Sequence, residues 1–340
     1  MAPQGSATIS DRRGARTFSL RLNNDLSVRQ FTELAAAAEE AGFDQVWVSH
    51  DLFWRSAPVL VAAAAAETRR VRLGTGIMNP FSAHPAELAM HAATLQELSH
   101  GRFLLGIGAG AEEFLAWAGL RRPRPLSAAR AAVLACRALL EGGSPAESGW
   151  QPQAHLRWDG PRVPIYLGAM GPKMLALGGE VADGVLGLSF PPERAQSSAD
   201  IVRNAAAAAG RDPATIDVPA CFWCSIDDDP DRAAAALAEK LAYYGPAISG
   251  VQLADAGLSP SSFVPAAQAL ERGDVATARR LITPHMLRLG VVGNAAAVVA
   301  RCRDLAAAGA MHLSFGPPLG PDPVAAVLRL GQEVLPGLAG

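Results

Sequence analysis

The chain has 340 residues, half of them hydrophobic, and a formal net charge of -2. This length and composition are typical of a globular protein with one large domain or two modest ones. The near-neutral charge and the lack of a dense basic run argue against nucleic acid as a partner. Residues 1–16 hold no apolar signal core and the longest alanine-rich run is too short to span a bilayer, so we expect a soluble cytoplasmic protein without membrane contact.

Short apolar strands alternate with helices after a polar tail at 1–16, which we expect to be disordered. Strands are predicted at 17–22, 43–48, 71–74, 102–107, 163–167, 184–188, 216–224 and 311–315. Helices are predicted at 28–41, 58–68, 84–98, 127–140, 172–181, 193–209, 233–243 and 295–308, with excursions at 142–160 and 246–289. Strands without polar alternation suit a parallel sheet that is buried on both faces, and eight of them can close into a barrel.

The predicted fold is therefore a single α/β domain over 17–340, a (β/α)8 TIM barrel with insertions after strands four and seven. A doubly wound sheet would also alternate strands and helices, but it gives no reason for the count to stop at eight.

The four cysteines do not form the pattern of a disulfide framework. Cys221 and Cys224 fall in one predicted strand, where side chains three positions apart point to opposite faces of the sheet. Together with Cys136 and Cys302 they are expected to be buried structural thiols, and no metal site is predicted.

The stretch Gly106-Ile107-Gly108-Ala109-Gly110-Ala111 satisfies the glycine pattern of a dinucleotide-binding turn. Such a turn also needs a helix that starts at the glycines, a strand soon afterwards and an acidic residue about twenty positions on. The next helix is predicted only at 127, the next strand only at 163, and no carboxylate lies near Arg130. The glycines are therefore interpreted as the end of a barrel strand.

Three other predicted strands end in a similar way, at Gly74-Thr75-Gly76, at 169–172 and at Gly316-Pro317-Pro318. Glycine at such positions lets a flat ligand or another backbone approach closely. Sharp turns alone would explain any one of the four stretches. Because barrel active sites gather at the carboxyl ends of the strands, four of them at one end favour a ligand-binding platform.

The likeness to a known family covers most of the chain and is carried by the segments 43–50, 73–80, 84–86, 94–102, 105–110, 163–173 and 316–322. They resemble the bacterial luciferase-like superfamily of flavin- or coenzyme F420-dependent oxidoreductases, and especially its methylenetetrahydromethanopterin reductase branch. The resemblance implies a (β/α)8 barrel that holds a tricyclic ring at its mouth, and it favours a homodimer. It also implies a non-prolyl cis peptide bond at Gly76-Ile77, as a bulge behind that ring.

The residues expected at the cofactor follow from the strand ends and from the resemblance. They are Ser49, His50, Thr75, Gly76, Ile77, Asn79, Gly108, Ala109, Gly110, Ala169, Met170, Gly171, Pro172, Lys173 and Met174. The loop 168–174 opens a helix, so its free N–H groups and the helix dipole suit a phosphate, and Lys173 adds a cation. A plain helix start with proline in its first turn is the alternative interpretation.

Three residues are candidates for catalysis. His50 directly follows the second strand and is expected to act as a general acid or hydrogen-bond donor, although Ser49 replaces the aspartate that often precedes it in the family. Glu112 and Glu113 follow the fourth strand, where some relatives carry an acidic group, but Ala111 occupies the matching position. The alternatives are a structural histidine and a solvated turn.

These features predict a coenzyme F420-dependent oxidoreductase, a reductase or dehydrogenase that transfers a hydride between the deazaflavin and a C=N or C=C bond of a small organic substrate. An FMN-dependent luciferase-like monooxygenase is the alternative, and a non-catalytic flavin-binding barrel remains open because Ser49 and Ala111 depart from the catalytic pattern. A barrel isomerase or aldolase is disfavoured, because Lys173 at a helix start is poorly buried for Schiff-base chemistry.

Overall fold

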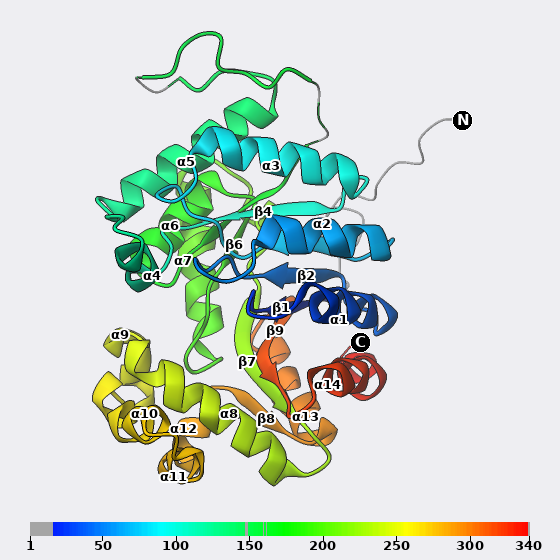
Figure 1. The fold of residues 1–340 in the computed structure, drawn as a ribbon, viewed down its shortest axis with the longest axis vertical. Helices are drawn as coiled ribbons and strands as arrows, with labels where there is room; N and C mark the ends of the chain where they lie inside the picture. The colour runs from blue at the N-terminus through cyan, green and yellow to red at the C-terminus, as the bar shows by residue number, and fades with distance from the viewer. Residues whose placement is uncertain (1–15, 147–148, 159, 161, 339–340) are drawn as a thin grey trace.

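The computed structural model describes residues 16–146, 149–158, 160 and 162–338. Nine parallel strands form one curled sheet of order β6-β5-β4-β3-β2-β1-β9-β7-β8 (Figure 1). The strands are β1 Thr17–Leu22, β2 Gln45–Val48, β3 Arg72–Thr75, β4 Phe103–Ile107, β5 Ile165–Gly168, β6 Gly184–Leu186, β7 Ala220–Ile226, β8 Val291–Gly293 and β9 His312–Leu319. Isolated parallel bridges join Gly184 to Asp217 and Leu188 to Cys221, so the β6 end of the sheet also lies beside β7.

Helices cover the outer face of this sheet (Figure 1). They are α1 Val28–Glu40, α2 Ala57–Glu67, α3 Pro85–Leu98, α4 Glu112–Trp117, α5 Pro125–Leu140, α6 Pro172–Val181, α7 Arg194–Ala208, α8 Pro230–Tyr244, α9 Gly250–Leu253, α10 Val264–Glu271, α11 Val275–Leu281, α12 Pro284–Leu287, α13 Ala295–Ala307 and α14 Pro323–Arg329. Helices α9–α12 gather beside α8, away from α1–α6. No helix in the described part of the chain is both long and apolar enough to cross a bilayer.

The predicted parallel α/β sheet is confirmed, with nine strands in place of eight. Strands β1 to β6 follow one another in sequence order without the reversal that defines a doubly wound sheet. The added strand, β8, is a short Val-Val-Gly segment that pairs with β7. The seventh strand begins at Ala220 rather than at 216, and within 216–219 only an isolated bridge of Asp217 to Gly184 is formed. The predicted tail lies outside the described residues except for Arg16.

One premise about the glycine stretch is wrong. A short helix, α4, starts at Glu112 directly after the glycines, where no helix was expected. The rejection of a dinucleotide-binding turn still holds, because β5 begins only at Ile165 and the strand order does not reverse. The helix was missed because its six residues include exposed glutamates and tryptophan, which are also typical of a polar turn.

Large aromatic side chains fill the inside of the curled sheet opposite glycines. A Cβ atom on Gly74 would lie 2.3 Å from the ring of Trp47, and one on Gly184 would lie 2.2 Å from the ring of Tyr166. The two rings also pack edge to face on each other, with centroids 4.8 Å apart. Glycine at 74 and 184 therefore leaves room for two rings in a packed interior.

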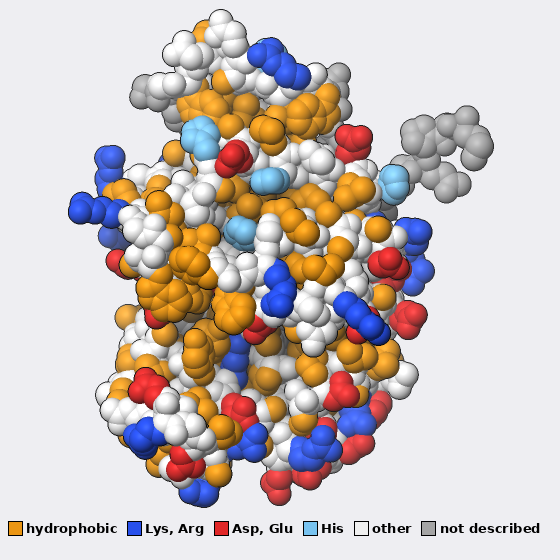
Figure 2. All heavy atoms as spheres, viewed as in Figure 1, with side chains coloured by type: hydrophobic (Ala, Val, Ile, Leu, Met, Phe, Trp, Pro, Cys, Tyr) orange, Lys and Arg blue, Asp and Glu red, His pale blue; other side chains and the backbone are white. Residues whose placement is uncertain are grey.

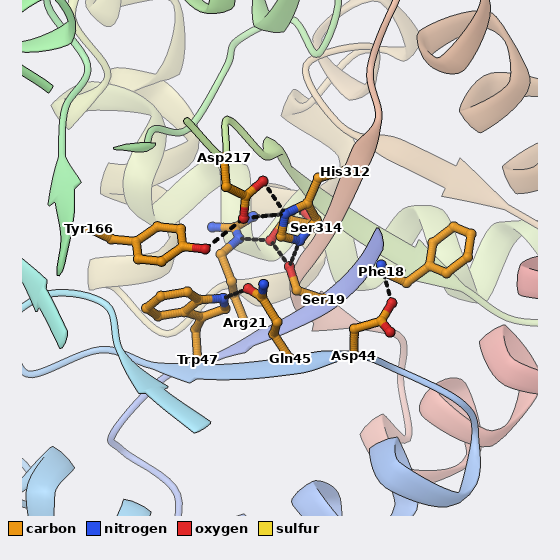
Figure 3. A network of polar contacts seen from close by, with 10 residues as sticks. All are labelled: Phe18, Ser19, Arg21, Asp44, Gln45, Trp47, Tyr166, Asp217, His312 and Ser314. Atoms are coloured by element: carbon orange, nitrogen blue, oxygen red, sulfur yellow. Dashed lines mark hydrogen bonds and ion pairs between the residues drawn. The ribbon is translucent and has the colours of Figure 1, made fainter. Parts of the chain in front are cut away.

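A buried polar network crosses the inside of the sheet (Figure 3). The Tyr166 hydroxyl donates to Asp217 Oδ2 at 2.7 Å, and His312 Nδ1 lies 2.9 Å from Asp217 Oδ1. Burial alone would raise the pKa of Asp217, but the charge and hydrogen bond of His312, with the Tyr166 hydroxyl, outweigh it and lower that pKa. Asp217 is therefore held as a buried anion with its polar neighbours satisfied.

The network continues toward the carboxyl ends of the strands. His312 Nε2 lies 2.8 Å from Ser19 Oγ, which donates to Ser314 Oγ at 2.8 Å. Arg21 Nε donates to Ser314 Oγ at 3.1 Å, and Arg21 Nη2 donates to the Phe222 carbonyl at 2.7 Å. The serines thus link the Asp217 carboxylate to the Arg21 guanidinium (Figure 3).

All four cysteines are buried and free, as predicted. Burial raises the pKa of the Cys136 and Cys302 thiols to about 12. A thiol that stays protonated at neutral pH is a poor nucleophile and a poor metal ligand, so these residues serve the packing of the core.

Candidate active site

The predicted site segments lie at the carboxyl ends of four neighbouring strands, β2 to β5. Residues 49–51 follow β2, residues 76–80 follow β3, residues 108–111 follow β4 and residues 169–174 follow β5. The carboxyl ends of parallel strands meet at one edge of a sheet, so these segments share the opening at that edge, here called the mouth.

The Ile77 side chain lies across the ends of β4 and β5. The Gly76-Ile77 peptide bond is cis, as the family resemblance implied. A Cβ atom on Gly108 or on Gly168 would stand 2.9 Å from Ile77 side-chain atoms. The glycines of the β4 end were expected to face a ligand directly, but Gly108 faces Ile77, which is itself part-exposed in the mouth. Ile77 therefore supplies the surface that a flat ring would meet.

The side chains of Thr75 and Asn79 form hydrogen bonds that hold the loop that carries Ile77. Thr75 is fully buried and its Oγ1 accepts from the Gly106 N–H at 3.2 Å, which ties β3 to β4. Asn79 is also buried, and its Oδ1 accepts from the N–H groups of Phe81 and Ser82 at 3.0 and 2.9 Å. Direct ligand contact was expected of both residues, whereas their side chains lie behind the mouth.

His50 presents a neutral imidazole with a defined tautomer. Its Nδ1 accepts a hydrogen bond of 3.1 Å from the Ala57 N–H, which leaves the ring proton on Nε2. Burial, and secondarily the nearby His91, lowers the pKa of His50. At neutral pH the ring is therefore an uncharged donor, and protonation would break its bond with Ala57.

Asn24 and Ser49 hold the loops that follow β1 and β2. Asn24 is 1% exposed, and its Nδ2 donates to the carbonyls of Asp51 and Arg55 at 2.9 and 2.8 Å. Ser49 Oγ donates to Asn24 Oδ1 at 2.9 Å and accepts from the Asn24 N–H at 3.1 Å. Ser49, expected at the cofactor, thus positions the His50 loop. Asn24 was not anticipated, because its partners lie 25 or more residues away in the chain.

Replacing Asn24 with alanine is expected to lower the free energy of unfolding by about 2–3 kcal/mol, because buried hydrogen-bond partners lose their donor and acceptor. Chemical denaturation measures this loss. Ser49→Ala, which removes one hydroxyl, should cost only about 1 kcal/mol. An Asn24→Ala protein as stable as the parent would show that the loop is held by other contacts.

The first turn of α6 is open to a ligand. Its N-cap is Gly171, which offers no side-chain cap, Pro172 follows, and the turn holds no acidic residue. Lys173 is exposed and Met170 is 47% exposed, whereas Ala169 is buried. Backbone N–H groups without a side-chain acceptor, beside a cation, suit an anion such as a phosphate.

Glu112 and Glu113 lie at the start of α4 and face outward. Glu112 forms an ion pair of 2.7 Å with Arg122, and its side chain is 76% exposed. Arg122 also donates to the Gly110 carbonyl at 2.9 Å, so the pair closes the loop that follows β4. Glu113 is exposed as well. The geometry favours a loop-closing role for Glu112 over the catalytic role expected from the sequence.

The β7 side of the mouth holds residues that no motif indicated as a group. Trp223 of β7 packs edge to face against Phe190, with ring centroids 4.7 Å apart, and lies 5.8 Å from the ring of Tyr244. Lys240 Nζ is 4.1 Å from the centroid of the Tyr244 ring and 5.5 Å from that of Trp223. The signal for Lys240 in the sequence is its rarity, because the chain has only two lysines.

Among the described residues, no group of three or more His, Cys, Asp or Glu could hold a metal ion. A hollow of about 320 Å³ lies at the amino end of β5, away from the mouth, lined in part by Arg137, Trp158 and Val163.

A family model described as luciferase-like monooxygenase matches residues 9–312. The chain belongs to this family. The 5,10-methylenetetrahydromethanopterin reductases of Methanolobus tindarius and Archaeoglobus fulgidus are each 30% identical to it, over 324 and 329 residues, and each match covers 94% of this chain and 99% of the relative. The resemblance inferred from the strand-end motifs is thereby confirmed.

Solved structures agree with this assignment. The coenzyme F420-dependent tetrahydromethanopterin reductase of Methanopyrus kandleri has a TM-score of 0.88 at 30% identity, covering 94% of this chain and 99% of that one. An F420-dependent secondary alcohol dehydrogenase in complex with an F420-acetone adduct has a TM-score of 0.78 at 22% identity, which shows the shared fold alone. The luciferase-like chain thus has the TIM-barrel-like fold of these oxidoreductases.

Proposed function

We propose that this protein is a coenzyme F420-dependent oxidoreductase that transfers a hydride between the deazaflavin and a C=N or C=C bond of a small organic substrate. The observation that carries the proposal is the meeting of three features at the mouth: the apolar Ile77 surface, the His50 donor and the open first turn of α6. Relatives named for F420, including the solved reductase of Methanopyrus kandleri and a glucose-6-phosphate dehydrogenase of Beutenbergia cavernae, support the same cofactor.

The residues present fit this cofactor. Ile77, backed by Gly108 and Gly168, would carry the flat ring, and the backbone N–H groups of Gly171 and Lys173, with the Lys173 side chain, would hold a phosphate. When bound, coenzyme F420 supplies a ring that carries a hydride, which side chains cannot do. His50 would hold a proton at Nε2 beside the reacting atoms, and its bond to the Ala57 N–H fixes the direction of that donor.

An FMN-dependent monooxygenase is the alternative, because the family takes its name from such enzymes and solved monooxygenases share the fold. We further infer a single (β/α)8 barrel domain over 17–340, in which β6 and β7 close the ring and the 142–160 and 246–289 segments are insertions. A homodimer and a cytoplasmic location are also part of the proposal.

Titration with coenzyme F420, followed by its fluorescence, tests the assignment of the α6 turn. Lys173→Gln is expected to weaken F420 binding about tenfold, because it removes the one side-chain cation of that turn while the backbone donors remain. The matched control is Arg29→Gln, which removes an exposed cation that is paired with Glu33 on α1, and it should bind F420 as the parent does. Equal affinity of the Lys173→Gln protein and the parent would remove this turn from the proposed site.

A further inference from the structure

Lys240 is held at one wall of the mouth by two aromatic rings. It lies one helical turn before Tyr244 on α8, which places its ammonium group 4.1 Å from the Tyr244 ring centroid, with Trp223 of β7 beyond. Burial is the main cause that lowers the pKa of Lys240 to about 8, with Arg21 acting in the same direction. Asp25 and Asp51, which follow β1 and β2, oppose this effect, so the charged form still predominates at neutral pH.

Arg21 lies at the same wall, at the end of the polar network in Figure 3. Its guanidinium occupies the space that a Cβ atom on Gly316 would fill, because that atom would stand 2.3 Å from Nη2. Burial lowers the pKa of Arg21, yet part of the residue remains accessible. Arg21 is thus crowded by protein and yet is not fully shielded from solvent.

Among the described residues, neither cation has a direct counter-ion. In the described part of the chain, Arg21 and Lys240 form no ion pair within 4 Å, and the Arg21 bonds found there use Nε and Nη2, which leaves the two N–H groups on Nη1. Asp25 and Asp51 act on Lys240 only from a longer distance. Two desolvated cations without a bound carboxylate are costly for the fold, and such an arrangement in a cleft is typical of a site that binds an anion.

The strand order separates this pair from the α6 turn. Arg21 belongs to β1, four strands from the β5 strand that precedes α6, and Lys240 packs on β7, which lies two strands from β5 through the bridges to the β6 end of the sheet. Figure 2 shows a hollow between the part of the molecule with α1–α6 and the part with α8–α12, and basic side chains line some of it. A phosphate held at the α6 turn cannot also reach Arg21 on the opposite side of the curled sheet, so the site that includes Arg21 calls for a second anionic group.

We infer that Arg21 and Lys240 form a subsite for the anionic group, a carboxylate or a phosphate, of the organic substrate. This inference rests on the proposed function for the identity of the reaction, but not for the binding of the anion. It narrows the substrate to a small organic anion whose reducible bond lies across the mouth from its charged group, with Trp223 and Tyr244 as an apolar wall beside it.

Calorimetric titrations with sulfate and with succinate test the subsite, at constant ionic strength set by sodium chloride. Sulfate stands in for a phosphate without titrating near neutral pH, and succinate stands in for a carboxylate. Lys240→Gln is expected to weaken binding of at least one probe about tenfold, whereas Lys240→Arg, which keeps the charge, should retain most of it. Arg29→Gln is the control and should bind as the parent does.

Two further measurements distinguish anion binding by Lys240 from a purely structural role and from a role in cofactor binding. Affinity for sulfate should fall in the parent as pH rises through about 8, where Lys240 loses its charge, and should not do so in Lys240→Gln. Coenzyme F420 should bind Lys240→Gln and the parent equally.

The inference would be overturned if the parent and Lys240→Gln bound sulfate and succinate with equal affinity. It would also be overturned if Lys240→Gln lost F420 binding, because that result would assign the cation to the cofactor. Failure of the parent to bind F420 would overturn the proposed function and leave the anion titrations to decide the subsite.

Discussion

His50→Ala is expected to lower kcat with coenzyme F420 by about 100-fold or more, while the affinity for F420 changes little. The physical reason is the loss of a positioned hydrogen-bond donor, since one such donor at the reacting centre contributes about 10²–10³ to the rate. The hydrogen bond from the Ala57 N–H to Nδ1 fixes the imidazole ring, so its proton lies on Nε2 and that atom is the donor that the alanine variant lacks. Steady-state kinetics on any accepted substrate, with F420 binding measured in parallel, separates the two effects.

The pH dependence of kcat shows which form of His50 acts. Burial lowers the pKa of His50 below its ordinary value near 6.5, so the neutral form predominates above that pH. If the neutral ring is the donor, kcat should stay level above about pH 6.5. At lower pH, kcat should fall, because His50 gains a proton on Nδ1 and loses its hydrogen bond with the Ala57 N–H. A kcat that rises toward acidic pH would instead assign the role to the charged ring. His155→Ala, at an exposed position of the 142–160 segment, serves as the control.

Gly74→Ala is expected to lower the free energy of unfolding by about 3 kcal/mol, the largest stability effect of the substitutions considered. The added Cβ would stand 2.3 Å from the Trp47 ring, which is itself packed against Tyr166 and cannot move aside without strain. Chemical denaturation monitored by circular dichroism gives the change. Gly250→Ala is the matched control, because its Cβ would meet only Pro260 at 3.8 Å, and it should change stability by less than about 0.5 kcal/mol.

The double variant Gly74→Ala/Trp47→Phe checks the assigned cause. Phenylalanine removes part of the ring that the new Cβ would strike, so the double variant should lose less stability than the sum of the two single variants. Strict additivity of the two losses would show that Gly74 is required for a reason other than contact with Trp47.

Most of the sheet could be predicted from the sequence because its strands are short, apolar and bounded by helices with clear ends. The eight predicted strands exist, whereas β8 was missed because Val291, Val292 and Gly293 are too few to form a pattern. Helices α4 and α14 were missed for the same reason of length, since they have six and seven residues. Periodicity identifies elements of several turns or strands of several residues, and shorter ones depend on tertiary contacts.

The site was predictable in place but not in detail. The glycines at the strand ends correctly predicted where the mouth lies. They were expected to face a ligand, whereas the Ile77 side chain fills the space next to Gly108 and Gly168. That packing depends on three strands at once and leaves no local pattern. Arg21 and Lys240 were missed for a related reason, because their lack of a direct counter-ion is a property of the fold and not of their neighbours in the chain.

The measurement that tests the central claim most directly is a parallel titration of the purified protein with coenzyme F420, FMN and NADP, followed by protein fluorescence. Binding of F420 at least tenfold tighter than FMN, with no binding of NADP, is the expected result. Preferential binding of FMN would assign the protein to the monooxygenase alternative, and binding of NADP alone would contradict the account of the mouth given by Ile77, His50 and the α6 turn.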